Sequence, residues 1–330
     1  MTVDVHCHYV SPTVRATVER EGERYGVRVL ERRNGGLLIQ IGSQTISRPL
    51  FHAIEELERR QEVMAQQTID HEVLSTWLDC TGYSLPPEQG IAWARLLNDA
   101  MAEDVKAAPR GRFSAVCTVP LQDGPAAAAE LQRAVGTLGY HGVVISTNVN
   151  GRNLEEPDLN PFWAAAQEAR APIIIHPAFV VETPRVADYH LFNLLGNPYD
   201  TAIAAASMVF GGVCDRFPDL QVVLVHGGGH FPYQIGRLTH GWGARPEAQR
   251  NLKTPPLDYL KWFYYDTLVY YPPALRYLAE QVGPERLMLG TDYPFEMCPD
   301  DPTRIVTDAG LSAQRERIFQ DNPSEVFRLR

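Results

Sequence analysis

The stretch Thr2-Val3-Asp4-Val5-His6-Cys7-His8 places two histidines at the end of the first apolar run of the chain. Side chains of a β-strand alternate between its two faces, so His6 and His8 point one way and Cys7 the other. Two imidazoles at the carboxyl end of a strand form half of a metal site, or they are ordinary core histidines. Alternation also predicts that Asp4 shares their face and accepts a hydrogen bond from a ligand ring.

Similar apolar runs recur along the whole chain, each short and bounded by polar residues, glycine or proline. They predict eight buried parallel strands, at 3–7, 72–76, 114–119, 142–146, 173–176, 222–226, 262–266 and 287–291. Apolar spacing predicts helices at 53–67, 87–108, 125–138, 161–170, 202–217 and 272–282. Eight strands alternating with helices favour an α/β fold of the (β/α)8 TIM-barrel class over an open doubly wound sheet. No Gly-x-Gly-x-x-Gly motif follows a strand, which argues against a dinucleotide-binding fold.

The segment between the first strand and the first predicted helix departs from this alternation. Residues 28–32 and 37–41 flank Asn34-Gly35-Gly36 and predict a β-hairpin, which residues 45–47 extend by a third strand. We therefore expect a small β-insertion at about 12–50, placed over the catalytic end of the barrel. No linker or internal repeat divides the chain, so residues 1–330 are predicted to form a single domain.

Composition narrows the classes of partner and the compartment. The net charge is −10, which disfavours nucleic acid or an anionic membrane as a partner. The five cysteines form no CxxC pair and are odd in number, so we expect no disulfide framework and a cytoplasmic location. We also expect no signal peptide, because no basic region followed by an apolar run is visible after Met1, and no run is long enough to span a membrane.

Titratable residues end several of the predicted strands. His176 ends the fifth strand, His226 the sixth, Asp266 the seventh and Asp292 the eighth. In a barrel of this class the active site gathers at the carboxyl ends of the strands, and the eighth strand lies beside the first. His6, His8, His176 and Asp292 can therefore converge as ligands of Zn²⁺ with one open position, and Mn²⁺ or Co²⁺ suit the same donors. For each residue alone, a role in the core or at the rim is the alternative.

Together these residues resemble the amidohydrolase superfamily, and within it the 2-amino-3-carboxymuconate-6-semialdehyde decarboxylase group. The resemblance covers nearly the whole chain. The matching strings are, in order, residues 3–8, His176-Pro177, 207–213, His226-Gly227-Gly228-Gly229-His230-Phe231-Pro232-Tyr233, Gly236-Arg237-Leu238-Thr239-His240-Gly241 and Gly290-Thr291-Asp292-Tyr293-Pro294-Phe295.

The resemblance implies roles for individual residues. It implies a single zinc held by His6, His8, His176 and Asp292, with His226 as the catalytic histidine. It implies that Arg48 and Arg237 bind substrate carboxylates and that Phe295 lines the pocket. Asn193, in the loop after the fifth strand, is a further candidate for substrate binding. Arg237 would reach in from a partner subunit, so a homodimer is expected.

Two features refine this expectation. Binuclear members of the superfamily carry a lysine at the end of the fourth strand, whereas this chain reads Gly142-Val143-Val144-Ile145-Ser146 there, which favours one metal over two. After Pro177 the chain has Ala178-Phe179 where the compared decarboxylases have an indole and an acidic residue. Part of the pocket wall therefore differs, and the substrate can differ with it.

The expected activity is nonoxidative decarboxylation of a small unsaturated or aromatic carboxylic acid. A zinc-bound hydroxide would act with His226, which accepts or relays a proton, and with Asp292, which orients the water. The alternative is a hydrolase or hydratase that uses the same metal hydroxide as its nucleophile. A third reading, a metal-binding protein without catalysis, requires the loss of a key group, and all five positions are filled.

Overall fold

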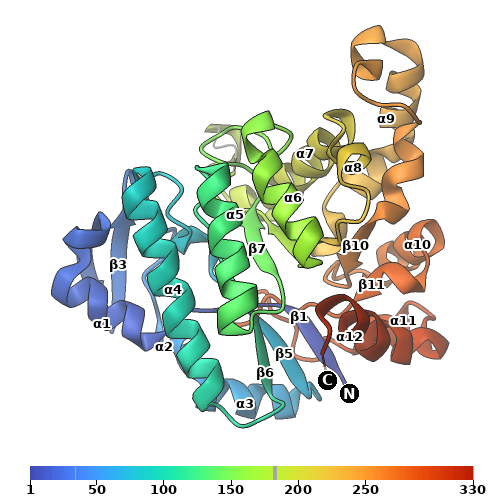
Figure 1. Cartoon of the computed structure of the whole chain (residues 1–330). Helices are drawn as coiled ribbons and strands as arrows, with labels where there is room; N and C mark the ends of the chain where they lie inside the picture. Colours follow the sequence, from blue (N-terminus) through green and yellow to red (C-terminus); the bar gives the residue numbers. More distant parts are fainter. Residues whose placement is uncertain (34, 181–183, 330) are drawn as a thin grey trace.

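The computed structural model describes residues 1–33, 35–180 and 184–329 (Figure 1). Eight strands lie in two parallel sheets, ordered β1-β5-β6 and β11-β10-β9-β8-β7. The strands are β1 (Val3–Tyr9), β5 (His71–Thr76), β6 (Phe113–Val116), β7 (Val143–Ser146), β8 (Ile173–His176), β9 (Val222–Leu224), β10 (Phe263–Asp266) and β11 (Leu287–Met288). The predicted α/β architecture with parallel strands is confirmed. The limits of most strands differ from the predicted ones by a few residues.

The two parallel sheets contact each other at both of their edges. Parallel bridges join Asp4 to Leu289, Cys7 to Tyr293 and Cys117 to Val143. The backbone N–H of Val5 donates to the carbonyl of Leu289 at 3.0 Å, and that of Val144 donates to Cys117 at 2.8 Å. Because every pairing is parallel, the carboxyl ends of the eight strands open on the same side of the molecule.

Helices alternate with the strands along the chain. They are α2 (His52–Glu55), α3 (Leu57–Gln66), α4 (Pro87–Ala107), α5 (Gly124–Arg133), α6 (Asn160–Ala169), α7 (Asn197–Phe210), α8 (Val213–Arg216), α9 (Phe231–Ala244), α10 (Pro272–Val282), α11 (Arg304–Asp308) and α12 (Asn322–Phe327). Several have a proline as their first or second residue, where a missing backbone N–H costs no hydrogen bond because first-turn N–H groups have no partner within the helix. The helix predicted at 53–67 is divided in two, because Glu56 is extended. Among the described residues, no helix combines the length and apolar character needed to cross a bilayer.

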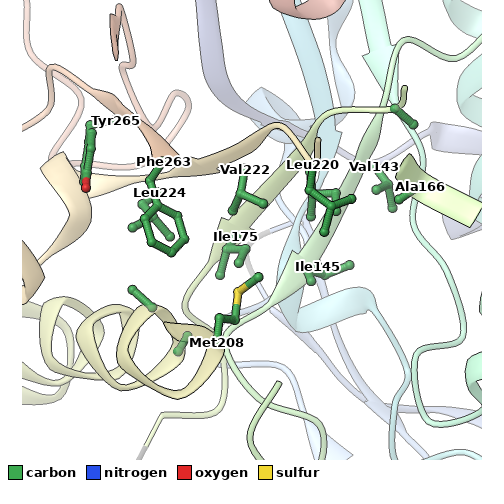
Figure 2. Packing of buried hydrophobic residues seen from close by; sticks show 14 of the residues in the cluster. Val143, Ile145, Ala166, Ile175, Met208, Leu220, Val222, Leu224, Phe263 and Tyr265 are labelled. Carbon is green, nitrogen blue, oxygen red and sulfur yellow. The ribbon is translucent and has the colours of Figure 1, made fainter. Parts of the chain in front are cut away.

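Alternate residues of the buried strands pack into two different clusters. Figure 2 shows one of them, in which Val143, Ile145 and Ile175 lie near Ala166 of α6 and Met208 of α7. The residues between them, such as Val144 and Ile174, belong to a second cluster. Side chains from β1, β5, β6, β7, β8, β9, β10 and β11 all enter or pack against that second cluster. Both faces of the strands are therefore apolar and covered, as parallel sheets require.

A bulge in β1 changes which of its side chains share a face. The register of β1 against β5 shifts between Asp4 and Cys7, so the strict alternation of the sequence is broken there. Val5 packs in the cluster shared by all eight strands, whereas Cys7 packs on the helix side. The expectation that Asp4 accepts from a ligand ring is wrong. Its carboxylate accepts instead from the backbone N–H of His6 at 3.0 Å and the hydroxyl of Thr291 at 2.6 Å.

The segment after β1 forms a separate small unit. It consists of α1 (Pro12–Glu21) followed by an antiparallel sheet of β2 (Val27–Arg33), β3 (Gly36–Ile41) and β4 (Gln44–Thr45). The hairpin lies where the sequence predicts it, with Asn34 of its turn outside the described residues, whereas α1 was not expected. Ser11 caps α1 by accepting from the N–H of Thr13 at 3.1 Å. Its buried apolar side chains, such as Val14, Ile39 and Leu50, share one cluster with Trp77 after β5 and with residues of α4, so the unit packs on that helix.

Candidate metal centre and active site

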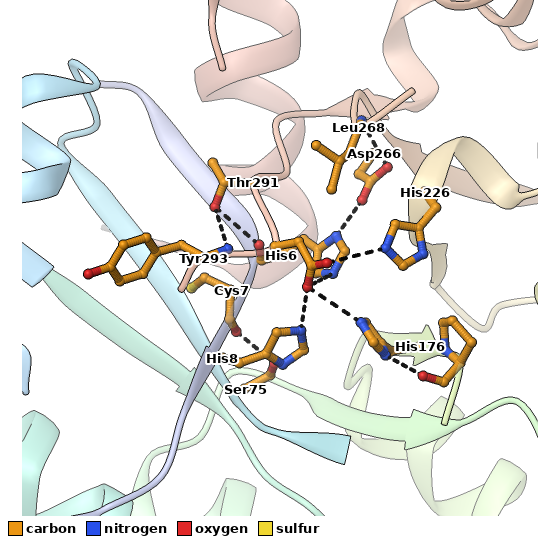
Figure 3. A network of polar contacts seen from close by, with 12 residues as sticks. His6, Cys7, His8, Ser75, His176, His226, Asp266, Leu268, Thr291 and Tyr293 are labelled. Atoms are coloured by element: carbon orange, nitrogen blue, oxygen red, sulfur yellow. Dashed lines mark hydrogen bonds and ion pairs between the residues drawn. The ribbon is translucent and has the colours of Figure 1, made fainter. Parts of the chain in front are cut away.

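Four of the predicted site residues lie together at the carboxyl ends of the strands. His6 and His8 lie on β1 and His176 ends β8 (Figure 3). Asp292 follows β11. One nitrogen or oxygen atom from each of the four lies within 4.8 Å of the others, and all four side chains are buried. Residues far apart in sequence thus meet because parallel strands end at a common edge.

Asp292 is the point at which the imidazole rings converge. Its Oδ1 lies 3.0 Å from Nε2 of His8, 3.3 Å from Nε2 of His6 and 3.7 Å from Nε2 of His176. Its Oδ2 lies 3.6 Å from Nε2 of His226, which follows β9. The predicted catalytic histidine therefore lies beside the predicted ligands, on the other oxygen of the same carboxylate.

The Nδ1 atom of each candidate histidine ligand contacts a hydrogen-bond acceptor. These Nδ1 contacts are Asp266 Oδ2 at 2.6 Å for His6, the carbonyl of Pro177 at 2.8 Å for His176, and Ser75 Oγ at 3.3 Å for His8. Ser75 donates its own proton to the carbonyl of Cys7 at 2.8 Å, so it accepts from His8. In the neutral form of each ring, which is the form that binds a metal, Nδ1 therefore carries the proton and Nε2 directs its lone pair at the centre.

The protonation of these groups follows from burial and from their contacts. Burial lowers the pKa of His8 and lowers that of His176 to about 3, so both rings are neutral near pH 7. Burial alone would raise the pKa of Asp292, but the surrounding imidazoles of His176, His226 and His6 hold that pKa well below its usual range. Burial likewise opposes a charge on His6, yet Asp266 and Asp292 together raise its pKa to about 10.

These donors suit a divalent cation. Nε2 of His6 and Nε2 of His176 are buried and make no hydrogen bond within the described residues. Unpaired buried nitrogens are uncommon, and here they face an ionised carboxylate. Three imidazole nitrogens and one carboxylate oxygen match the ligand sets of Zn²⁺ and of other first-row divalent metals.

Asp266 connects the candidate metal ligand His6 to the turn that carries His226. While its Oδ2 holds the ring of His6, its Oδ1 accepts the backbone N–H of Gly227 at 2.8 Å and that of Leu268 at 3.1 Å. Sequence reasoning found that Asp266 ends a strand but assigned it no role. Its position at a strand end, like that of the ligands, was the available signal. Ser75, the partner of His8, carried no comparable signal.

Replacing Asp266 with asparagine is expected to weaken metal binding by about 10- to 100-fold, because the ring of His6 loses its anionic partner. Titrating the metal-free protein with Zn²⁺ against a chromophoric chelator measures this change. The exposed Asp258 provides a matched control, since Asp258→Asn removes the same charge far from the strand ends. Wild-type metal affinity in Asp266→Asn would contradict the positioning role.

The backbone around the site is left-handed at two functional positions. The φ angles of His226 and Asp292 are +54° and +61°, values that non-glycine residues seldom adopt. Between β11 and Asp292, Gly290 passes so close to its neighbours that a Cβ there would lie 2.8 Å from the Cβ of Asp266 and 2.9 Å from the Cβ of His6. The turn after β11 therefore requires glycine to bring Asp292 to the rings.

A cavity of about 810 Å³ lies above these residues, with His176 and Asp292 in its lining. Three of the predicted substrate-binding residues, Arg48, Asn193 and Phe295, also line it. The ring of Phe295 lies 5.3 Å from that of His8, centroid to centroid. Sequence reasoning did not identify Trp77, Asp79, His190 and Glu296, which complete much of the wall.

Arg237 is the predicted substrate-binding residue that the fold does not bring to this cavity. It lies on α9, is exposed, and is outside the described lining of the cavity. Within one subunit it therefore contributes nothing to the substrate cavity.

The parallel α/β fold and the three-histidine, one-carboxylate site define a class of metal-dependent enzymes. The chain belongs to the amidohydrolase family, whose model matches residues 3–329. The resemblance predicted from the sequence is thereby confirmed.

Several of the proteins that this chain resembles are decarboxylases. The chain is 38% identical to 2-amino-3-carboxymuconate-6-semialdehyde decarboxylase of Dictyostelium discoideum, over 75% of this chain and 69% of that protein. It is 29% identical to gamma-resorcylate decarboxylase of Rhodococcus jostii, over 82% of this chain and 87% of that protein. Among solved structures it is similar to 5-carboxyvanillate decarboxylase of Novosphingobium aromaticivorans in complex with manganese, with a TM-score of 0.80, 25% identity, and coverage of 100% of this chain and 96% of that one.

Proposed function

We propose that this protein is a metal-dependent nonoxidative decarboxylase of a small aromatic or unsaturated carboxylic acid. The observation that carries the proposal is the convergence of four imidazoles on Asp292 at the floor of a cavity that Arg48 also lines. The related decarboxylases support the reaction type. Their substrates differ from one another, so they support a class of acid rather than one compound.

In this proposal His6, His8, His176 and Asp292 hold one divalent metal, and zinc suits the donors best, with manganese or cobalt as alternatives. When bound, the metal supplies a positive charge that polarises a substrate oxygen and acidifies water. The manganese in the related carboxyvanillate decarboxylase structure supports a divalent ion without distinguishing among these metals.

His226 is proposed to move the proton that the reaction consumes. Decarboxylation breaks the bond between the carboxylate carbon and the carbon that carries it, and the bonding electrons stay on the latter as CO2 leaves. That carbon must then take a proton. Nε2 of His226 lies 3.6 Å from Oδ2 of Asp292, so the ring lies beside the proposed metal site, where it is proposed to deliver the proton to that carbon.

The remaining predicted residues position the substrate. Arg48 is proposed to pair with a substrate carboxylate, because a guanidinium offers two parallel donors to such a group. Phe295 offers an apolar surface beside His8, and Asn193 lies in the cavity wall with an amide available to hydroxyl or carbonyl groups. The departures at Ala178 and Phe179, both in the lining, support a substrate that differs from aminocarboxymuconate semialdehyde.

Product analysis tests the function. The metal-loaded protein is incubated with a panel of hydroxybenzoic and muconate-type acids, and both CO2 release and oxygen-18 uptake from labelled water are measured. The proposal expects CO2 together with a product that has lost its carboxylate and gained one hydrogen. Hydrolysis or hydration, with labelled oxygen in an organic product and no CO2, would replace the lyase with the alternative activity.

We further propose that residues 1–330 form one (β/α)8 barrel with an insertion at about 12–50. The bridges at both edges of the parallel sheets support closure, as does the cluster to which all eight strands contribute. The antiparallel sheet between β1 and α2 supports the insertion. Cooperative unfolding in a single calorimetric transition would be the expected behaviour of one domain, and two separate transitions would contradict it.

The proposed location is the cytoplasm. The five cysteines are free thiols, which supports a reducing compartment.

We propose that the active form is a homodimer in which Arg237 enters the cavity of the partner subunit. Figure 1 shows α9 projecting beyond the helices next to it. Tyr199 of α7 and Tyr233, near the start of α9, are exposed. Large exposed aromatic side chains are common where proteins associate. Arg237 lies on the same helix as Tyr233 and is free of its own cavity.

Mixing two inactive variants tests this arrangement. Arg237→Gln and His226→Gln are each expected to be inactive, but hybrid dimers carry one site with both residues intact. Refolding or exchanging the two proteins together is therefore expected to restore activity. A mixture that stays inactive, or a wild-type protein that sediments as a monomer at assay concentration, would contradict the shared site.

A further inference from the structure

The guanidinium of Arg48 already holds a carboxylate of its own chain. It forms an ion pair with Glu296, which lies on the turn after Asp292. The same guanidinium lies over the ring of Phe295, 5.1 Å from its centroid, and Phe295 in turn contacts His8. Arg48, Phe295 and Glu296 all line the cavity. The group proposed to recognise the substrate is thus occupied by an internal competitor.

Arg48 itself is fixed in place by the loop after β5. The carboxylate of Asp79 accepts the backbone N–H of Ser47 at 2.7 Å, so the residue before Arg48 is tied to the rigid part of the fold. Asp79 also lines the cavity, which adds a second acidic side chain to the wall near Arg48. Because its carboxylate accepts this hydrogen bond from Ser47, Asp79 holds the backbone next to Arg48 in place.

The carboxylate of Glu296, in contrast, can move out of the ion pair with Arg48. Its side chain is 80% exposed, whereas that of Arg48 is only 30% exposed. Within the described residues, Arg48 is the one side chain that pairs with its carboxylate. The hydrogen bond from Arg48 holds the pKa of Glu296 below its usual value, so the carboxylate is ionised at neutral pH. A rotation of the Glu296 side chain into solvent exposes the guanidinium to the cavity without a movement of the backbone.

We propose that Glu296 is a specificity-determining residue that occupies Arg48 in the empty enzyme and is displaced by the carboxylate of the incoming acid. The inference rests on the proposed function for its substrate class. Binding then exchanges one carboxylate for another at the same guanidinium, so the net gain from Arg48 is small for any acid. Acids that make further contacts at the metal centre and with Phe295 bind well, whereas acids that rely on the Arg48 contact alone are retained poorly.

The substitution Glu296→Gln in the metal-loaded enzyme tests this inference. Benzoate is the probe, since it offers a carboxylate and little else, and benzamide is its neutral counterpart. Removing the competitor is expected to tighten benzoate binding by about two- to fivefold in calorimetry, the range of an exposed ion pair. Benzamide binding is expected to stay the same. For the acid found in the CO2-release screen, the change is expected in KM more than in kcat.

Two controls separate competition from general electrostatics. Glu280→Gln removes the same charge from an exposed position on α10 and is expected to leave benzoate binding unchanged. In an Arg48→Gln background, adding Glu296→Gln is expected to have no further effect, because the contested guanidinium is gone. Unchanged or weaker benzoate binding in Glu296→Gln, or a gain that persists without Arg48, would overturn the inference. Calorimetry measures binding and needs no turnover. If benzoate binding tightens in Glu296→Gln as expected but no acid in the screen releases CO2, only the proposed function is refuted.

Discussion

Replacing His226 with glutamine is expected to lower kcat by about 10²- to 10⁴-fold while the metal stays bound, the usual range for loss of a general acid or base. His226 contacts Oδ2 of Asp292, whereas the three candidate ligands gather at Oδ1. Glutamine keeps a polar group of similar reach but cannot take up and release a proton near neutral pH. Steady-state kinetics together with elemental analysis of the purified variant measures both parts of this expectation.

The exposed His240 offers a matched control for His226, because it lies on α9 and is outside the described lining of the cavity. His240→Gln is expected to keep wild-type kcat. Near wild-type activity in His226→Gln would remove His226 from the mechanism. Loss of metal in that variant would instead place His226 among the residues that hold the ion.

Removing the metal is expected to abolish decarboxylation and to lower Tm. A metal ion that binds only the folded state stabilises it by an amount that grows with the logarithm of the ion concentration over Kd. Differential scanning calorimetry before and after dialysis against a chelator measures the shift. Adding Zn²⁺, Mn²⁺ or Co²⁺ back, one at a time, is expected to restore Tm and activity to different extents. Full activity in metal-free protein would sink the metal-dependent mechanism.

Protons are expected to compete with the metal at His6. In the metal-free protein its pKa is about 10, above the ordinary 6.5, because the carboxylates of Asp266 and Asp292 outweigh the burial that opposes a charge. A raised pKa means that the proton stabilises the metal-free fold fully below pH 6.5, and that this contribution is lost as pH rises towards 10. Metal binding must displace that proton, so apparent affinity is expected to rise across this window. Calorimetric titrations at several pH values measure it.

The convergence of the site was predictable because it depends on strand ends. His6, His176 and Asp292 each follow an apolar run, and parallel strands whose carboxyl ends open on one side bring such positions together whatever their separation in sequence. The α/β architecture followed from the same pattern, since short apolar runs between amphipathic stretches have few other solutions. The family resemblance then supplied roles for Arg48 and Arg237 that no periodicity could have supplied.

Features that depend on local irregularity were out of reach. The bulge in β1, which moves Asp4 away from the ligand rings, leaves no mark in a run that alternates normally on paper. The helix α1 was hidden because its apolar face is narrow, with Val14 and Val18 buried among polar residues. The pairing of Arg48 with Glu296 joins two segments that only the folded chain brings together.

The apolar cluster that the insertion shares with α4 has a consequence for how this enzyme can change. The metal floor of the cavity comes from the strand ends, whereas Thr45, Ser47 and Arg48 come from the segment that packs on this cluster. Substitutions at cavity-facing positions of residues 27–50 can therefore reshape one wall of the cavity while the candidate ligands below it stay unchanged. Substitutions of the buried residues of the insertion also disturb Trp77 and Phe295, because both pack in or against the same cluster. The cavity-facing side chains of the insertion are therefore the place to begin engineering.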